Sequence, residues 1–392
     1  MDSFNLNKLK EFIPKELPIP SWPTSHRSMN PDDEDEAANN RNAPPVPPKS
    51  DRQSSMSAMV LAEPKPITSG PRTNLDLINE CDNFPYYQNN AQLFFACVNT
   101  YYGLYVEEYP EVELGYLLPS VAAVFKGLPD WKVDDDDRSL TLVTGSNEAE
   151  RSRIVAATCE AMRATGHFKI LEGWRNELYP VYGPNRDLLF SVERAASSLF
   201  GIVTYGVHMT AYTMVKGDKA EQDRIKDMRL WIARRAITKQ TYGGMLDNTV
   251  AGGMATGERP LECMVRECEE EASLQEDVVR KSLRAAGTVT YFHVRDHRAG
   301  GETRLLEPEC QYVYDLELDE DVVPKPHDDE VEGFELKTVE QTKEALRNGE
   351  FKPNCALVLL DFFVRHGILT PEDDGYIEII ARLHRKFEFP TL

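Results

Sequence analysis

The sequence lacks long apolar runs and any pattern of paired cysteines. No segment approaches the ~18 apolar residues that a membrane-spanning helix needs. The opening residues, MDSFNLNKLKEF, contain no apolar core of a secretory signal. The seven cysteines form no CxxC pair, so we expect neither a disulfide framework nor a structural zinc site. We therefore predict a cytoplasmic protein without a membrane segment.

Positive charge is also scarce. The chain has 44 Lys and Arg against 65 Asp and Glu, which gives a formal net charge of -21 at pH 7. This charge repels the phosphate backbone of nucleic acids, and the sequence contains no local basic patch to offset it. We therefore expect no nucleic-acid partner. A polyanionic substrate would need metal ions or a few well-placed Arg and Lys side chains.

The first part of the chain, residues 1–73, is rich in proline and acidic residues. It holds 12 of the 25 prolines and the acidic run DDEDE. Such a segment buries too little apolar surface to offset its chain entropy, so we predict a disordered tail. Within it, the tract 43–49, APPVPPK, matches a polyproline ligand for SH3-like grooves, although a short tract of this kind is more often a solvated linker.

Three ordered parts follow the tail. Residues 74–226 alternate strand-like and helix-like pieces, including a helix over 147–166, which predicts an N-terminal α+β module. Residues 227–350 predict a second domain that mixes strands with helices, one of them over 276–287. Residues 351–392 predict a C-terminal helical extension that packs on this second domain. The expected fold class is therefore α/β (α+β).

The stretch GGMATGERPLECMVRECEEEASL, which begins at Gly252, carries six glutamates. Most charge runs of this kind are solvated helix faces. A phosphate-binding loop is excluded, because Glu258 and Arg259 follow Gly257 where such a loop needs Lys and Ser or Thr. A metal site is the third interpretation, and the spacing of the glutamates favours it.

Three of these glutamates share one face of the predicted helix. Glu267, Glu270 and Glu271 lie at positions i, i+3 and i+4, which brings their carboxylates within reach of one ion. Oxygen ligands of this kind select the hard cations Mg²⁺ or Mn²⁺. Arg266 is expected to pair with Glu262 or Glu270 and to fix a carboxylate.

These positions also carry a family resemblance. Gly252, Glu258, Arg266 and the three metal glutamates follow the spacing G-x5-E-x7-R-E-U-x-E-E-x-G-U, so the stretch resembles the Nudix box; Ser273 replaces its last glycine. The resemblance implies an α/β/α sandwich that hydrolyses a diphosphate linked to another moiety. It implies these roles: metal ligands Gly252 (through its carbonyl), Glu267, Glu270 and Glu271, catalytic residues Glu267, Glu330 and Arg266, and supporting residue Glu258. The catalytic base would be Glu267 or Glu330, and we favour Glu267.

A narrower resemblance covers residues 74 to 390. Stretches such as LWIARRAITKQTYGGMLDNTVAGG resemble fungal and plant Nudix proteins called thiamin pyrophosphokinase-related. This implies hydrolysis of thiamin diphosphate or its oxidised analogues, with an 8-oxo-dGTP or other nucleotide diphosphatase and a non-catalytic ligand sensor as alternatives. Arg235 and Lys239 stand where related folds place diphosphate-binding cations. Trp174 is a candidate to stack on a substrate ring, whereas His208 is expected in the core.

Overall fold

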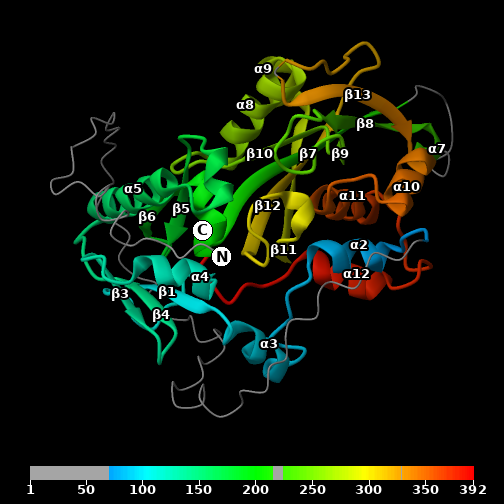
Figure 1. Cartoon of the computed structure of the whole chain (residues 1–392). Coiled ribbons are helices and arrows are strands. Elements are labelled where there is room, and N and C mark those ends of the chain that lie inside the picture. Colours follow the sequence, from blue (N-terminus) through cyan, green and yellow to red (C-terminus); the bar gives the residue numbers. More distant parts are fainter. Residues whose placement is uncertain (1–69, 215–223, 328) are drawn as a thin grey trace, which may run out of the picture.

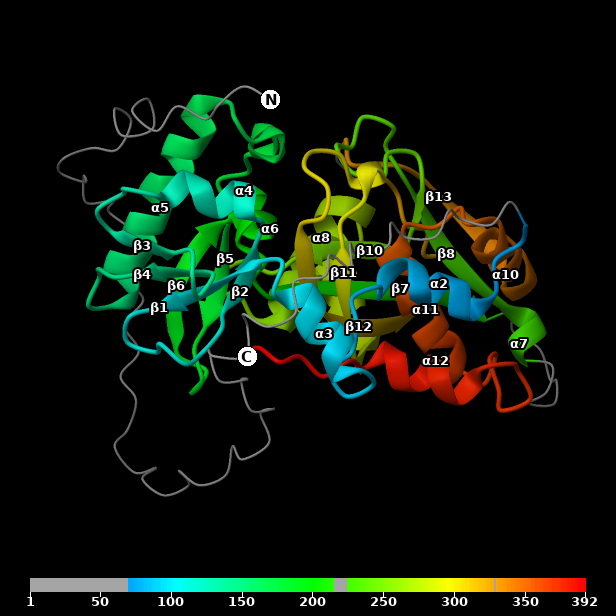
Figure 2. The ribbon, with the colours of Figure 1, turned by 60° about the horizontal axis from the view of Figure 1, so that its bottom comes forward.

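The computed structural model describes residues 70–214, 224–327 and 329–392. The predicted disordered tail, apart from residues 70–73, and the polyproline tract 43–49 lie outside the described residues. Two lobes lie next to each other in the described part of the chain, and Figure 2 shows the smaller N-terminal lobe beside the larger one. No helix among the described residues is both long and apolar enough to cross a membrane.

The smaller lobe combines a mixed sheet, an antiparallel strand pair and one long helix. A 4-stranded sheet has the order β2-β1-β4-β3, and β5 pairs with β6 separately. The strands are β1 (Tyr102–Val106), β2 (Gly115–Leu117), β3 (Trp131–Asp134), β4 (Ser139–Leu142), β5 (Leu178–Tyr182) and β6 (Leu188–Glu193). The helices are α4 (Pro119–Ala122), η2 (Ala123–Phe125), α5 (Glu148–Thr165), η3 (Lys169–Gly173), η4 (Arg194–Ala196) and α6 (Ser197–Phe200).

Helix α5 confirms the helix predicted over 147–166. The Asn147 side chain accepts a hydrogen bond from the Glu150 N–H at its start, and Gly166 ends it with φ 63. Both are standard signals, an asparagine N-cap and a left-handed glycine at the C-terminus. The helix packs against β6, and its buried residues join one apolar core with Phe125 and Phe200.

The larger lobe is built on a 7-stranded mixed sheet with the order β11-β12-β7-β8-β13, to which β10 adds at β7 and β9 at β8. Its strands are β7 (Thr204–Met214), β8 (Met228–Arg235), β9 (Leu246–Asp247), β10 (Val250–Gly253), β11 (Leu283–Val294), β12 (Leu306–Glu317) and β13 (Val331–Thr338). Its helices are α2 (Asn74–Cys81), α3 (Ala91–Val98), α7 (Arg224–Asp227), α8 (Pro260–Ala272), α9 (Glu276–Ser282), η6 (His297–Ala299), α10 (Val339–Asn348), α11 (Pro353–Arg365) and α12 (Tyr376–Leu383).

Helices cover both faces of this sheet. Helices α8 and α9 share one apolar core with the sheet, whereas α2, α10, α11 and α12 share another. Alternate residues of β8 enter the two cores, Trp231 on one side and Leu230 and Ile232 on the other, as the period of a strand requires. The α/β fold class expected from the sequence is confirmed, and the arrangement is the expected α/β/α sandwich (Figure 1).

The predicted range of the N-terminal module differs from the structure at both ends. Strand β7 was assigned to this module but pairs with β8, β10 and β12 in the larger sheet. Helix α2 was also assigned to it, yet packs against α11 and α12 of the larger lobe. We therefore propose that the module begins near residue 100 and ends near residue 203.

One helix is shorter than the sequence predicts. The helix expected over 276–287 ends at Ser282, and β11 begins at Leu283. Leu283 pairs with Leu316 and Arg284 with Asp315 across β12, so strand pairing overrides the helical preference of this segment.

Candidate active site

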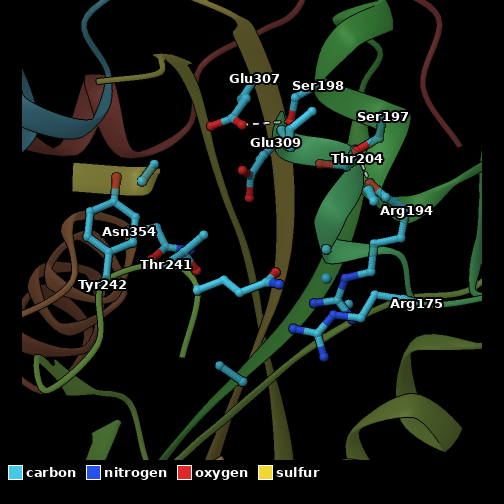
Figure 3. A pocket seen from close by; sticks show the side chains of 18 of the residues that line it. Arg175, Arg194, Ser197, Ser198, Thr204, Thr241, Tyr242, Glu307, Glu309 and Asn354 are labelled. Carbon is cyan, nitrogen blue, oxygen red and sulfur yellow. Dashed lines mark hydrogen bonds between the residues drawn. The ribbon is translucent and has the colours of Figure 1, made fainter. Parts of the chain in front are cut away.

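A cavity of about 500 Å³ lies between the two lobes. The smaller lobe contributes residues of η3, β5, η4 and α6 to its wall, and the larger lobe contributes residues of β7, β10, α8 and β12. Figure 3 shows charged side chains from both lobes around this cavity. Its volume lies within the roughly 300–1,000 Å³ typical of small-molecule sites.

Helix α8 brings two of the predicted metal glutamates to this cavity. Its apolar side, which includes Cys263, Met264 and Cys268, is buried against the sheet. Glu267 and Glu271, one turn apart, lie on this same sheet-facing side of the helix, next to β10, and both line the cavity wall. Ser273 ends the helix with φ 53, the left-handed conformation that the glycine of the Nudix box would adopt more easily.

The Glu267 carboxylate lies directly against the backbone of β10. A Cβ atom added to Gly252 would stand 2.0 Å from Cδ of Glu267, which is far inside van der Waals contact. Only glycine at this position therefore allows the buried Glu267 to approach the strand. The structure thus brings together two of the predicted metal ligands, Gly252 and Glu267.

The surroundings of Glu267 and Glu271 disfavour the charged forms of both carboxylates. Glu271 accepts a hydrogen bond from the Ala251 N–H (2.9 Å), yet burial, and then the charge of Glu267, raise its pKa well above the ordinary value. Burial also raises the pKa of Glu267 to about 7, against the opposing effect of Arg266. A divalent cation would relieve both effects, and carboxylate oxygens are its preferred ligands. The residues present therefore fit Mg²⁺ or Mn²⁺.

Arg266 connects three of the motif carboxylates. Its Nε and Nη2 donate to Oε1 and Oε2 of Glu258 (2.9 and 3.2 Å), and its Nη1 donates to Glu267 Oε1 (2.9 Å). The predicted pair with Glu270 is confirmed by an Nη1–Oε2 distance of 2.8 Å. The alternative partner, Glu262, pairs with Arg280 instead.

Glu270 is the predicted metal ligand that does not reach the cavity. Its side chain is 53% exposed and is held by Arg266, whereas Glu267 and Glu271 line the cavity wall. Glu270 would have to leave Arg266 before it could bind an ion beside the other two.

Three other predicted site residues, Arg235, Lys239 and Glu330, also line the cavity. Arg235 donates from Nη1 to Asp247 Oδ2 (2.7 Å) and from Nη2 to the Thr241 carbonyl (3.0 Å). Lys239 forms an ion pair with Glu330. Burial raises the pKa of Glu330, but this ion pair and a second one with Arg175 outweigh burial and hold that pKa below its ordinary value.

Trp174 lies outside the cavity wall. The guanidinium carbon of Arg163 is 4.8 Å from the centre of its ring, and its Nε1 donates to Asn176 (2.9 Å). The ring also packs on the core of the smaller lobe.

Sequence reasoning missed several residues of the cavity wall. Glu307, Glu309 and Gln311 lie on one face of β12 and line the cavity, and their alternate spacing was the available signal. Arg175 and Arg194 enter from the smaller lobe.

A second group of possible metal ligands lies beside the cavity. Ligand atoms of His208, Asp247 and Cys355 are all within 4.8 Å of one another. The Cys355 thiol donates to Asp247 (2.7 Å), and the His208 ring forms a hydrogen bond with Asn248 (2.8 Å), outside the group. Since Arg235 supplies a positive charge to Asp247, we expect no ion here. The expectation that His208 is a core residue is confirmed by its burial.

Comparisons with known proteins agree with the two lobes. The family model described as "NUDIX domain" matches residues 221–355, and that of a "Domain of unknown function (DUF4743)" matches residues 98–204. An uncharacterized protein of Saccharomyces cerevisiae is 39% identical over 247 residues, which are 62% of this chain and 70% of the yeast protein. Nudix hydrolase 20, chloroplastic, of Arabidopsis thaliana is 39% identical over 242 residues, which are 60% of this chain but only 59% of the plant protein. A crystal structure of the protein DR0079 from Deinococcus radiodurans covers 47% of this chain and 99% of its own, with 20% identity and a TM-score of 0.34.

Proposed function

Because the chain belongs to the Nudix family of hydrolases, which act on phosphorus-containing anhydrides, we propose that it is a Mg²⁺-dependent pyrophosphohydrolase. Its substrate would be a small molecule that carries a diphosphate linked to another moiety. The observation that carries the proposal is the glutamate pair of α8: both side chains line the cavity, Glu267 against Gly252 and Glu271 at the Ala251 N–H.

The carboxylates of Glu267 and Glu271, with the Gly252 carbonyl, would hold the cation. When bound, a Mg²⁺ or Mn²⁺ ion neutralises charge on the diphosphate and lowers the pKa of a coordinated water. Arg266 keeps Glu258 and Glu267 in place through its hydrogen bonds, and it releases Glu270 if that residue joins the site. Its role is therefore to position the ligands.

Glu267 is the better of the two candidate bases. Both oxygens of Glu330 are engaged, one by Arg175 and the other by Lys239, and these cations favour its ionised, weakly basic form. Glu267 stands beside Glu271 at the cavity, where its carboxylate can accept a proton from an attacking water. We therefore propose Glu267 as the base and assign Glu330 to holding Lys239 and Arg175.

Thiamin diphosphate or one of its oxidised analogues is the substrate that we propose first. Glu309 has no cationic partner among the described residues, and its carboxylate accepts hydrogen bonds only from Tyr291 (2.6 Å) and Gln311 (2.6 Å). Burial raises the pKa of Glu309 and so disfavours its charged form; a cationic ring in the cavity would stabilise that form, which a neutral nucleobase would not do. Nucleotides such as 8-oxo-dGTP are the alternative substrates, and a non-catalytic ligand sensor is the second alternative function. The cytoplasmic location stays a prediction.

A substrate panel tests this function. Phosphate release should be measured with Mg²⁺ from thiamin diphosphate, its oxidised analogue, 8-oxo-dGTP and ADP-ribose. We expect turnover of a thiamin compound that stops when EDTA removes the ion, because the glutamate pair then lacks its counter-charge. If the wild-type protein hydrolyses none of the four while still binding one of them, the sensor function replaces the enzymatic one.

A further inference from the structure

We propose that Arg175 and Arg194 bind phosphoryl oxygens of the substrate, so that the N-terminal lobe completes the active site. Both residues belong to the smaller lobe, within the residues 98–204 that match a domain of unknown function. The proposal rests on the diphosphate substrate proposed above, and it gives this lobe a role in substrate binding.

The two arginines point into the cavity from the same wall (Figure 3). Arg175 follows η3, and its backbone N–H donates to Glu193 Oε1 (2.9 Å) at the end of β6. Arg194 follows directly on Glu193. The Glu193 carboxylate therefore holds the backbone of Arg175 close to that of Arg194.

Arg194 reaches the strand that carries the metal site. A Cβ atom added to Gly253 would lie 3.3 Å from Cζ of Arg194 and 1.9 Å from Oη of Tyr179. Gly253 follows Gly252, the residue that contacts the Glu267 carboxylate. Consecutive glycines of β10 thus accept Glu267 from one lobe and Arg194 with Tyr179 from the other. Since both side chains line the same cavity, a diphosphate bound at Glu267 would share that cavity with the Arg194 guanidinium.

These arginines are more accessible than the cations that the sequence pointed to. The side chains of Arg175 and Arg194 are 40% and 38% exposed, against 11% for Arg235 and 15% for Lys239. Arg235 is committed to Asp247 and a loop carbonyl. The two accessible guanidinium groups are therefore better placed to receive a ligand from the cavity.

Each of the two guanidinium groups retains unused donors. Within the described part of the chain, Arg194 donates only to Glu177 (Nη1–Oε2, 2.8 Å), and the Arg175 guanidinium donates only to Glu330 (3.2 Å). A guanidinium carries five N–H donors in a planar fork, which matches the oxygens of a phosphate. Two such groups, added to a divalent cation, suit the charge of a diphosphate.

The lobes are also fastened at the rim of the cavity. Glu302 of the larger lobe accepts hydrogen bonds from the backbone N–H groups of Lys169 (2.6 Å) and Ile170 (3.0 Å), at the start of η3. The Arg175–Glu330 ion pair adds a second connection. Arg175 therefore enters the cavity from a segment that is anchored to the larger lobe.

Binding of methylenediphosphonate, a diphosphate that cannot be hydrolysed, tests the proposal. Its Kd should be measured by calorimetry with Mg²⁺ for the full chain and for the variants Arg175→Ala and Arg194→Ala. We expect each variant to raise Kd roughly tenfold or more, the effect of losing a charge-assisted hydrogen bond. The matched control is Arg186→Asn, because Arg186 is exposed outside the cavity wall, and asparagine tolerates its positive φ of 64. Its Kd should stay within about twofold of the wild type.

The outcomes separate this proposal from the proposed function. Unchanged Kd values in both alanine variants, or no binding by the wild type, overturn the role of the arginines. If the variants bind the diphosphonate more weakly than the wild type, but the wild type hydrolyses no substrate, the role of the arginines is supported and the hydrolase function is rejected. If Arg194→Ala fails to fold because Glu177 loses its partner, Arg194→Lys replaces it, since lysine keeps the positive charge. Lysine lacks the planar set of N–H donors of a guanidinium, so this variant should still raise Kd severalfold.

Discussion

Replacing Glu271 by glutamine is expected to lower the turnover number for the diphosphate substrate by about a thousandfold or more, because one carboxylate ligand of the cation is lost. The fold should persist, since the glutamine side-chain oxygen can still accept the hydrogen bond that the Ala251 N–H gives to Glu271 (2.9 Å). Steady-state rates of phosphate release at saturating Mg²⁺ provide the measurement.

The same variant should be more stable than the wild type when no ion is present. The pKa of Glu271 is raised in the folded chain, so its contribution to stability is present at low pH and is lost as pH rises through the folded pKa. Glutamine does not ionise. We therefore expect a higher Tm for Glu271→Gln in EDTA at pH 8, and a smaller difference at pH 5.

Glu269→Gln is the matched control on the same helix. Glu269 is exposed on α8 and does not line the cavity, so its replacement should leave both the rate and Tm close to wild type. Equal losses of rate in the two variants would point to the charge of the helix rather than to a bound ion. Full activity of Glu271→Gln would remove this residue from the site.

Replacing Gly252 by alanine should lower the turnover number by roughly a hundredfold, because displacing a reacting group by about 1 Å has an effect of this size. The new Cβ would stand 2.0 Å from Cδ of Glu267 and would push that carboxylate away from β10. The side chain of Glu267 can rotate, so the chain should fold, and the loss should fall on kcat.

Gly333→Ala is the control for this substitution. A Cβ at Gly333 meets no heavy atom within 4 Å, and this glycine also lies in a strand of the larger sheet. We expect its kinetics to match the wild type. Near-wild-type kcat in Gly252→Ala would show that Glu267 does not act from the position against β10.

The local parts of the site were predictable because they depend on short-range chemistry. Helix α8 follows from Pro260 at its start and from its apolar spacing, and the same period brings Glu267 and Glu271 to one side. The period left open whether Arg266 pairs with Glu262 or with Glu270, and so it did not predict the orientation of Glu270. That orientation depends on Arg266, which is held in turn by Glu258 from the loop before the helix.

The remaining parts of the site depend on contacts between distant segments. Strand β7 pairs in parallel with β12, about a hundred residues further along the chain, and no local pattern identifies that partner. Trp174 and Arg175 are neighbours in the sequence, yet only the arginine enters the cavity, because of how η3 meets β6. A single sequence therefore indicated the chemistry of one lobe but not the contribution of the other.

The position of a bound cation tests the central claim most directly. Crystals grown with Mn²⁺ give an anomalous signal that locates the ion without reference to any assumed ligand. We predict a peak within coordination distance, roughly 2.0–2.2 Å, of carboxylate oxygens of both Glu267 and Glu271. A peak at the group formed by His208, Asp247 and Cys355 instead, or no peak near α8 at saturating Mn²⁺, would contradict it.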